Sequence, residues 1–331
     1  MMLGCDHVRV GVPATSANLG PGFDSLGLAL GIRDELEVRA LGSPGVVVEV
    51  SGQGADDVPD GEAHLVVRAV RLALDHVGAP QTGLHLTCTN RIPQGRGLGS
   101  SAAAVVAGLL AVRGLIADPD ALDDEVVLRL ATELEGHPDN AAPAILGGVT
   151  IAWNEVDGPR AVRVATHPDL TPVLLVPSTR LATVYARSVL PTRVPHADAV
   201  FQAGRAALLI EALTRRPDLL FPATEDRLHQ HYRAAVMSET LALVDALRAR
   251  GVAAVVSGAG PTVLALARAT GGGSSDVDDA VRAAFGGVMG GWQVLRPGVD
   301  DHGGRVDRVL PERAFGRSAK PVGRAGPKDR A

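Results

Sequence analysis

A glycine-rich loop is the part of this chain whose residue types and spacing point most directly to chemistry. The segment Ile92–Ala104 reads IPQGRGLGSSAAA and opens onto a long run of small apolar residues. Glycines let backbone N–H groups turn toward an anion without an obstructing Cβ, and the first turn of a helix adds unpaired donors and a positive dipole end. The pattern therefore predicts a phosphate-binding loop at a helix N-terminus.

Two familiar nucleotide loops do not fit this segment. It lacks the Gly-Lys-Ser/Thr ending of a P-loop, and its glycine spacing differs from the dinucleotide-binding fingerprint. A half-buried strand is expected just before the loop, because Leu84, Leu86 and Cys88 alternate with polar residues. The order strand, loop, helix is the context that a nucleotide loop of a third kind requires. The alternative is a helix cap with close strand–helix packing.

Composition and charge exclude several classes of function. The chain has 331 residues, 46% of them hydrophobic and 3% aromatic, which favours a two-domain enzyme with helices packed tightly on sheet. A net charge of −5 without interleaved basic and aromatic residues argues against nucleic acid as a partner. Cys5 and Cys88 suggest neither a disulfide framework nor a zinc site, so a reducing cytoplasm is expected. The apolar runs are too short for a signal peptide or a membrane span, and no membrane partner is expected.

Hydrophobic spacing and turn residues predict the elements that position the loop. We expect strands near residues 8–12, 35–40, 46–50, 84–88, 148–153, 173–176, 253–257 and 262–267, and helices near 62–78, 100–114, 122–135, 198–215 and 238–249. The segment Pro13–Asp24 is expected to be a polar turn, and Pro159–His167 a loop near a domain boundary at residue 160. By composition, Thr270–Asp279 is predicted to be a flexible connection, and the tail from Pro311 to be disordered.

Three segments, in this order and spacing, resemble the GHMP kinases. They are PATSANLGPGFDSLGL at residues 13–28, the loop at 93–104, and SGAGPT at 257–262. Within that superfamily, HPDNAAPAILGG at 137–148 and the Thr183, Arg187 and Leu190-Pro191 pattern resemble the homoserine kinases. The resemblance covers residues 8–300, which is most of the chain.

The resemblance implies a fold and an activity. The fold is α+β with the two-domain GHMP kinase architecture: a ribosomal S5 domain 2-like N-terminal ATP-binding domain over residues 1–160, a ferredoxin-like C-terminal domain over 161–300, and a tail over 301–331. The active site is expected between the two domains. The implied reaction transfers a phosphoryl group from ATP to the side-chain hydroxyl of L-homoserine, giving O-phospho-L-homoserine for threonine biosynthesis. The implied enzyme is a cytoplasmic homodimer.

The resemblance also assigns residues to ATP and Mg²⁺. Adenine is expected near His64 and Leu65, which open a helix. The ATP phosphates are expected along the loop, at Pro93, Gln94, Gly95, Arg96, Gly97, Leu98, Gly99, Ser100, Ser101, Ala102 and Ala103. The Ser101 hydroxyl is placed on Mg²⁺, with Glu135 as the candidate second ligand and Glu133 as its rival. Arg96 either adds charge at a phosphate or is a solvated loop residue, and His64 either lines the adenine pocket or only caps the helix.

A zwitterionic substrate needs a carboxylate for its ammonium group and cationic or amide donors for its carboxylate. Asp24 and Asn18 suit the amine and hydroxyl side, while Arg187 and Arg233 suit the carboxylate. The alternatives are an Asx-turn at Asp24 and a surface arginine at Arg233, beside Tyr232.

The tetrapeptide at residues 137–140 supplies the remaining candidates. We expect His137 and Asn140 to contact substrate, and Asp139 is the alternative catalytic base, although a structural turn is also possible here. Phosphoryl transfer needs positioning and charge stabilisation more than a strong base. The expected catalytic environment is Mg²⁺, the loop amides, Arg187 and Asn140. The turn at residues 257–262 either supports the loop from the second domain or is a purely structural hairpin.

Three other functions remain open from the sequence. A related kinase acting on mevalonate or shikimate would keep the loop, but it would not need the pairing of Asp24 with arginines. A nucleotide- or metabolite-sensing protein would keep the fold without catalysis. An anion-binding scaffold would work through partners, with the basic tail as its contact.

Overall fold

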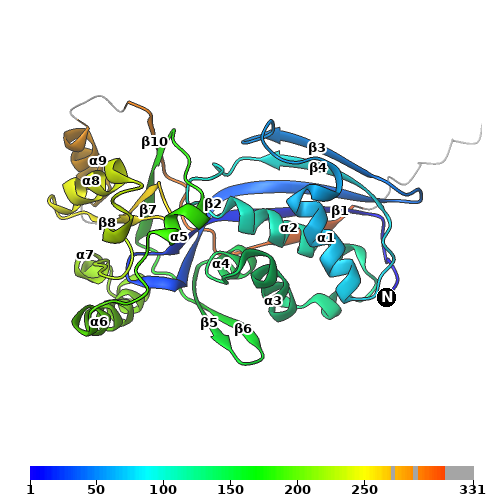
Figure 1. The fold of residues 1–331 in the computed structure, drawn as a ribbon, viewed down its shortest axis with the longest axis horizontal. Helices are drawn as coiled ribbons and strands as arrows, with labels where there is room; N and C mark the ends of the chain where they lie inside the picture. The colour runs from blue at the N-terminus through cyan, green and yellow to red at the C-terminus, as the bar shows by residue number, and fades with distance from the viewer. Residues whose placement is uncertain (270–272, 286–289, 310–331) are drawn as a thin grey trace, which may run out of the picture.

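The computed structural model describes residues 1–269, 273–285 and 290–309, which form two layered units side by side (Figure 1). The larger unit contains the strands β1 (His7–Asn18), β2 (Gly22–Leu41), β3 (Val46–Gly52), β4 (Gly83–Asn90), β5 (Val149–Glu155), β6 (Gly158–Val164) and β11 (Arg305–Arg308). Its helices are α1 (Leu65–His76), α2 (Ser100–Leu115), α3 (Asp124–Glu135) and α4 (Ala141–Leu146), with short 3₁₀ turns at Gly61–Ala63 and Pro119–Leu122. The strand order is β11-β1-β2-β4-β3, and the β5–β6 hairpin pairs with β2.

The smaller unit is built on a second sheet with the order β10-β7-β9-β8. Its strands are β7 (Leu170–Pro177), β8 (Ala253–Val256), β9 (Val263–Arg268) and β10 (Trp292–Leu295). Its helices are α5 (Thr183–Ser188), α6 (His196–Thr214), α7 (Leu220–Ala223), α8 (Ser238–Arg248) and α9 (Gly273–Ala284), with 3₁₀ turns at Pro217–Leu219 and His231–Arg233. No helix in the described ranges is both long enough and apolar enough to cross a membrane.

Small residues explain how the helices of the larger unit pack. Most of α2 is buried, and a Cβ added at Gly108 would press on the Val66 carbonyl and the Ala69 side chain of α1. Helices α1 and α2 can therefore approach closely and lie over one face of the sheet (Figure 1). This close packing fixes the start of α2, where the glycine loop ends.

The smaller sheet is covered on both faces, as the alternation of its side chains requires. In β7, Leu174 belongs to the core cluster that includes α6 and α7. Its neighbours Val173 and Leu175 belong to a second cluster with α8 and α9. The smaller unit therefore shares one of its cores with the larger unit, because the first cluster runs through both.

The segment Pro13–Asp24 is not the polar turn that the sequence predicts. Strand β1 continues to Asn18 and β2 begins at Gly22, so the turn between them is limited to residues 19–21. The polar side chains of Thr15 and Ser16 are buried in the strand because their hydroxyls find distant partners in Asn140 and Ser257.

Three further expectations also need correction. Residues 158–164 form strand β6 rather than a loop, so the expected boundary at residue 160 falls inside a strand. Helix α9 covers residues 273–279 of the predicted flexible connection, and residues 270–272 lie outside the described ranges. The predicted tail 301–331 begins too early, because β11 pairs with β1 in the larger sheet; the part from Pro311 lies outside the described residues.

The last described segment returns from the smaller unit to the larger one. Val299 bridges to Leu30, and the Arg33 guanidinium makes two hydrogen bonds of 2.7 and 2.8 Å to the Asp300 carboxylate. Asp300 also accepts hydrogen bonds from the backbone of His302 and Gly303. The return segment thus leads β11 to the edge of β1.

Candidate active site

The glycine loop joins β4 to α2 and presents a row of unpaired backbone donors. Gly95, Gly97 and Gly99 have φ angles of 65°, 74° and 68°, a region that side chains rarely adopt. None of the N–H groups of residues 97–102 donates a hydrogen bond to another described residue. The helix cap is Gly99 itself, which offers no side chain to these donors. The loop therefore has the features of an anion site at a helix N-terminus.

The turn at residues 257–262 supports this loop from the smaller unit. The Ser257 hydroxyl donates to the Gly97 carbonyl over 2.6 Å and lies 2.8 Å from the Ser16 hydroxyl. A Cβ at Gly97 would overlap the Ser257 carbonyl oxygen, and a Cβ at Gly99 would overlap the Thr15 hydroxyl. The β8–β9 turn is thus a hairpin that also supports the glycine loop. Glycine is required at positions 97 and 99 because Ser257 and Thr15 lie too close for a side chain.

Arg96 is bonded within the protein rather than freely solvated, and its contact with a phosphate stays a prediction. Its guanidinium donates to three backbone carbonyls, those of Gln94, Pro177 and Ser178, at 2.8 to 3.1 Å. Burial, and then the neighbouring Arg180, lower the pKa of Arg96. The side chain joins the loop to the end of β7, and a second contact follows where the Leu181 N–H donates to the Gly95 carbonyl.

The two candidate metal ligands lie together. The Ser101 hydroxyl, in the first turn of α2, donates to the Glu135 carboxylate over 2.6 Å. Glu135 is the last residue of α3, which Gly136 terminates at a φ of 85°. Glu133 is exposed and does not line the cavity that Ser101 and Glu135 line. Within the described ranges no cluster of three or more His, Cys, Asp or Glu side chains could hold a metal ion by itself.

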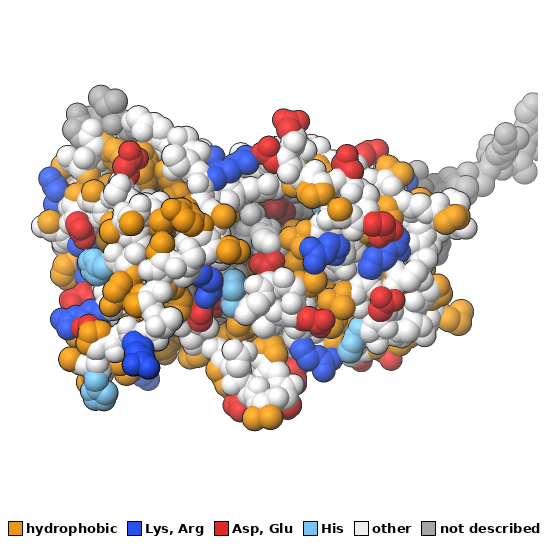
Figure 2. All heavy atoms as spheres, viewed as in Figure 1, with side chains coloured by type: hydrophobic (Ala, Val, Ile, Leu, Met, Phe, Trp, Pro, Cys, Tyr) orange, Lys and Arg blue, Asp and Glu red, His pale blue; other side chains and the backbone are white. Residues whose placement is uncertain are grey.

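A cavity of about 360 Å³ runs along the loop between the two units, where Figure 2 shows the surface hollowed. We call it the main cavity. Predicted residues at its wall are Asn18, Gly95, Gly97, Leu98, Gly99, Ser100, Ser101, Ala102, Glu135, His137, Asp139, Asn140, Arg187 and Arg233. It is therefore lined by both metal candidates and by every substrate candidate except Asp24, which does not line it. Pro93 is buried in the loop beneath and does not line it.

A second cavity of about 280 Å³, the side cavity, adjoins the loop on its other side. His64 and Leu65 line it, and so do the loop residues Gln94 and Ala103. The His64 side chain makes no capping hydrogen bond to α1, and its buried Nδ1 has no partner in the described structure. Burial lowers the pKa of His64, so the ring is neutral near pH 7. Ser100 and Ser101 line both cavities.

Asp24 and Arg187 are bonded to each other. The Arg187 guanidinium donates to both carboxylate oxygens of Asp24, at 2.6 and 3.0 Å, which makes the bidentate geometry of a strong ion pair. The hydrogen bond to Asp24 raises the pKa of Arg187. Asp24 has a φ of 54°, and Asn18 a φ of 70°, in a conformation that non-glycine residues rarely adopt. Strain at two neighbouring polar residues beside a cavity is typical of functional sites.

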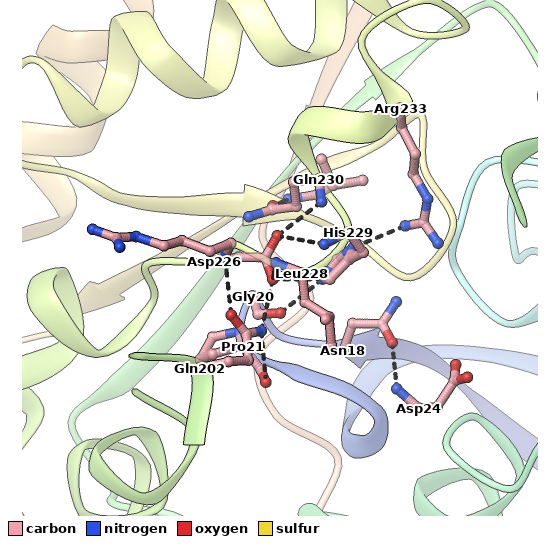
Figure 3. Close-up of polar contacts among 12 residues, drawn as sticks. Asn18, Gly20, Pro21, Asp24, Gln202, Asp226, Leu228, His229, Gln230 and Arg233 are labelled. Atoms are coloured by element: carbon pink, nitrogen blue, oxygen red, sulfur yellow. Dashed lines mark hydrogen bonds and ion pairs between the residues drawn. The ribbon is translucent and has the colours of Figure 1, made fainter. Parts of the chain in front are cut away.

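Asn18 holds this corner together. Its amide nitrogen donates to the Gly258 carbonyl over 2.8 Å, and its amide oxygen accepts from the Asp24 N–H at 3.0 Å (Figure 3). Both ends of the side chain are thus used by the protein. Asn18 fixes Asp24 against the β8–β9 turn.

The tetrapeptide at residues 137–140 places three side chains at the main cavity. His137 Nδ1 lies 2.7 Å from the Asp139 carboxylate, and this hydrogen bond raises the pKa of His137. Asp139 is only 1% exposed. The Asn140 oxygen accepts from the Thr15 hydroxyl over 2.9 Å, which turns its NH₂ group toward the cavity.

Arg233 is buried rather than on the surface. It is 1% exposed, and its Nε and Nη1 atoms donate to the carbonyls of Ala186 and Gly258 at 3.2 and 3.1 Å. Nη1 also lies 3.0 Å from His229 Nδ1, as Figure 3 shows. Burial, and then the neighbouring Arg187, lower the pKa of Arg233 to about 10, so the group stays charged near neutral pH.

Sequence reasoning missed the residues behind this arginine. Asp226, His229 and Gln202 are buried polar side chains of the smaller unit. His229 and Gln202 contact the turn between β1 and β2, and Asp226 contacts Gln202. The only sequence signal was the polar run at residues 225–230 between two apolar helices, which also suits an exposed loop.

Known proteins resemble this chain over nearly its whole length. Residues 64–148 match the model of the GHMP kinases N terminal domain, and residues 199–286 match that of the GHMP kinases C terminal domain. The homoserine kinase of Streptomyces coelicolor is 53% identical over 300 residues, which are 90% of this chain and 94% of that one. This chain belongs to the homoserine kinase family. The homoserine kinase of Streptomyces avermitilis is 52% identical over 90% of this chain and 95% of its own.

Membership of this family agrees with the fold. The crystal structure of homoserine kinase from Cytophaga hutchinsonii superposes with a TM-score of 0.79 at 26% identity, covering 92% of this chain and 98% of that one. The predicted two-domain GHMP kinase fold of the α+β class is confirmed. The chain is an ATP-dependent kinase of this family.

Proposed function

We propose that this chain transfers the γ-phosphoryl group of ATP to the side-chain hydroxyl of L-homoserine, giving O-phospho-L-homoserine, a step of threonine biosynthesis. One observation carries the proposal: a single cavity is lined by the glycine loop and by Arg187, whose guanidinium is paired with the Asp24 carboxylate, so an anion site and opposite charges suited to an amino acid lie together. The names of the relatives support the same substrate.

ATP fits the two adjoining cavities. The unpaired N–H groups of residues 97–102 would receive the phosphates, because backbone donors at a helix N-terminus favour anions. The side cavity would take the adenine ring beside His64 and Leu65. Its unpartnered His64 Nδ1 offers one polar contact among mainly apolar neighbours. Ser100 and Ser101 lie where the two cavities meet, as a nucleotide spanning both requires.

The residues at the end of the loop fit Mg²⁺. This ion prefers oxygen ligands and keeps most of its shell for water and substrate phosphates, so one or two protein oxygens suffice. Ser101 and Glu135, whose oxygens are 2.6 Å apart at the wall of the main cavity, would supply them. Bound there, Mg²⁺ would neutralise charge on the phosphates. Glu133 is the weaker candidate because it does not reach the cavity.

Homoserine would bind by inserting its two charges between Asp24 and Arg187. The ammonium group would pair with the Asp24 carboxylate, and the substrate carboxylate with the Arg187 guanidinium. Arg233 Nη2, which makes no hydrogen bond within the described chain, would add a second donor to the carboxylate. One ion pair of the free protein is thereby replaced by two with the substrate, and no charge is left alone.

Transfer of the phosphoryl group does not require a strong general base. The homoserine oxygen forms a bond to the γ-phosphorus as the bond to the leaving oxygen of ADP breaks, and the hydroxyl proton leaves late, for solvent or the transferred phosphoryl group. Asp139 is buried, and one carboxylate oxygen is already bonded to His137, so it is poorly placed to receive that proton. Arg187 and the NH₂ group of Asn140 are the polar side chains that would face the transferring group.

The test is ADP release from Mg-ATP by the purified protein, with L-homoserine, L-serine, mevalonate and shikimate compared. Turnover confined to L-homoserine, and lost in Ser101→Ala, would support the proposal. Turnover of mevalonate or shikimate would keep the kinase and discard the amino-acid site. Nucleotide binding without turnover of any alcohol would point to the sensing function instead.

Two further properties belong to this proposal. Cys5 and Cys88 are both free thiols, which supports the cytoplasm as its location, because reducing compartments keep thiols unpaired. The homodimer stays a prediction, which light scattering on the purified protein would test.

A further inference from the structure

A buried polar cluster lies behind the substrate end of the main cavity, between the β1–β2 turn and the segment at residues 226–233 (Figure 3). His229 and Asp226 have fully buried side chains, and Arg233 is 1% exposed. Burying such groups is costly unless each polar atom has a partner, so the hydrogen bonds determine their chemical states.

The two partners of His229 fix its tautomer. Its Nε2 lies 2.8 Å from the Gly20 carbonyl oxygen, which can only accept a hydrogen bond. Its Nδ1 lies 3.0 Å from Arg233 Nη1, and a guanidinium can only donate. The ring must therefore carry its proton on Nε2 and accept at Nδ1, as a neutral imidazole. Burial lowers the pKa of His229, in agreement with this state.

A second set of contacts holds the segment that carries His229. The Asp226 carboxylate accepts from the backbone N–H groups of Leu228, His229 and Gln230 at 2.8 to 3.1 Å. It also accepts from Gln202, whose amide nitrogen donates to the Pro21 carbonyl over 3.0 Å. Two successive carbonyls of the β1–β2 turn are thus bonded to the smaller unit.

The turn held in this way carries the residues proposed for the amine side of the substrate. Asn18 and Asp24 flank it, both with positive φ, and their strained backbone needs external support. Arg233, at the other end of the His229 ring, is proposed for the carboxylate side. The two sides come from different units, and His229 contacts the turn at Gly20 and the guanidinium of Arg233.

We propose that His229 is a positioning residue for amino-acid recognition, an inference that rests on the proposed function. As the neutral Nε2–H tautomer it connects the Gly20 carbonyl to the Arg233 guanidinium. It sets the distance between the cationic group and the turn that carries Asp24. Phe23 stacks on the ring with centroids 4.9 Å apart, and it also lies beneath the guanidinium groups of Arg187 and Arg233, at 5.6 and 5.8 Å.

Two variants separate the two hydrogen bonds. In His229→Asn the amide oxygen reaches the place of Nδ1 and keeps the acceptor for Arg233, whereas His229→Gln reaches the place of Nε2 and keeps the donor for Gly20. His229→Phe keeps the stacking on Phe23 and removes both bonds. His231→Phe is the matched control, because His231 is exposed on the same segment two residues away.

The kinetic readout is the KM of each substrate. We expect all three variants to raise the KM for L-homoserine, His229→Phe by about tenfold or more, because each breaks the connection between Gly20 and Arg233, with the KM for ATP unchanged throughout. With 3-aminopropan-1-ol, which lacks the carboxylate, the wild type and His229→Gln should have equal kcat/KM. Equal losses with both alcohols, or a matching rise in the KM for ATP, would mean a general structural role and overturn the proposal. So would a His229→Asn or His229→Gln variant that keeps the wild-type KM for L-homoserine, since one bond alone would then be enough.

A second measurement needs no activity. In protein labelled with ¹⁵N-histidine, the His229 resonance, assigned by its loss in His229→Asn, should show a protonated Nε2 and an unprotonated Nδ1 at pH 7. The opposite tautomer or an imidazolium would refute the arrangement. If the wild type proves to phosphorylate a different alcohol, the proposed function fails while this measurement still decides the state of His229.

Discussion

The pairing of Asp24 with Arg187 gives the sharpest test of how the substrate is recognised. We consider Asp24→Asn, which removes the negative charge with little change of shape. Asparagine is one of the few residues that tolerate a positive φ such as the 54° of this position, so the fold should be kept. The change should weaken the contact to the substrate ammonium group and leave the ATP site unaltered.

The magnitude follows from the kind of bond that is lost. A hydrogen bond to a charged group contributes about 1.5 to 3 kcal/mol, and each 1.4 kcal/mol is about a factor of ten. The Asp24 side chain is 38% exposed, so water screens the interaction and the lower part of this range applies. We expect kcat/KM for L-homoserine to fall roughly 10- to 30-fold.

A coupled assay of ADP release would measure this, with 4-hydroxybutanoate as a second substrate that lacks the ammonium group. Because nothing on that substrate pairs with Asp24, Asp24→Asn should leave its kcat/KM nearly unchanged or raise it. Asp157→Asn is the control, since Asp157 is 71% exposed and bonded to Arg160 in the β5–β6 hairpin. An equal loss with both substrates would refute the assignment of Asp24 to the ammonium group.

Three other predictions address the loop, the metal and the base. Gly97→Ala should raise the KM for ATP and lower the free energy of unfolding by at least about 1–3 kcal/mol, measured by urea unfolding. The reason is that the new Cβ would overlap the Ser257 carbonyl oxygen and that Gly97 has a φ of 74°. An unchanged KM for ATP would argue against the loop as the phosphate site. Glu135→Gln should increase the Mg²⁺ concentration needed for half-maximal rate about tenfold or more, while Glu133→Gln should not, and equal effects would remove the assignment. Asp139 raises the pKa of His137, so their bond should stabilise the fold fully below the ordinary histidine pKa of about 6.5 and lose this effect as the pH rises through the raised value. Asp139→Asn should therefore flatten the pH dependence of the unfolding free energy and leave kcat within about tenfold. A loss of several orders of magnitude in kcat would instead make Asp139 the base.

The order of strand, glycine loop and helix could be predicted from the sequence because its signal is local. Three closely spaced glycines followed by Ser100 and Ser101 are typical of an anion-binding loop, and they can be recognised without knowing the rest of the fold. The long β1–β2 hairpin could not be predicted in this way. Thr15 and Ser16 look like turn residues until their partners are known, and those partners lie 125 and 241 residues away.

The same limit applies to the arginines. The resemblance to the homoserine kinases, with the zwitterionic substrate it implies, indicated that Arg187 and Arg233 could bind a carboxylate, and both lie at the main cavity. Sequence alone did not indicate that Arg187 would form an ion pair with Asp24, that Arg233 would be buried, or that the Arg96 guanidinium would donate to backbone carbonyls. Each of these outcomes depends on how the two units close on one another, which no local pattern specifies.

The strand β11 has a consequence for the order in which the chain folds on the ribosome. The phosphate loop and the first two strands are synthesised early, but β1 gains its β11 neighbour only after residue 308 has been made. Until then the β1 edge of the large sheet has unpaired N–H and C=O groups, which can form hydrogen bonds with strands of other chains. A polypeptide released before Asp300 would also leave Arg33 without its carboxylate partner. Nascent chains stalled within the smaller unit should therefore aggregate, although nearly all of the nucleotide site has already been translated.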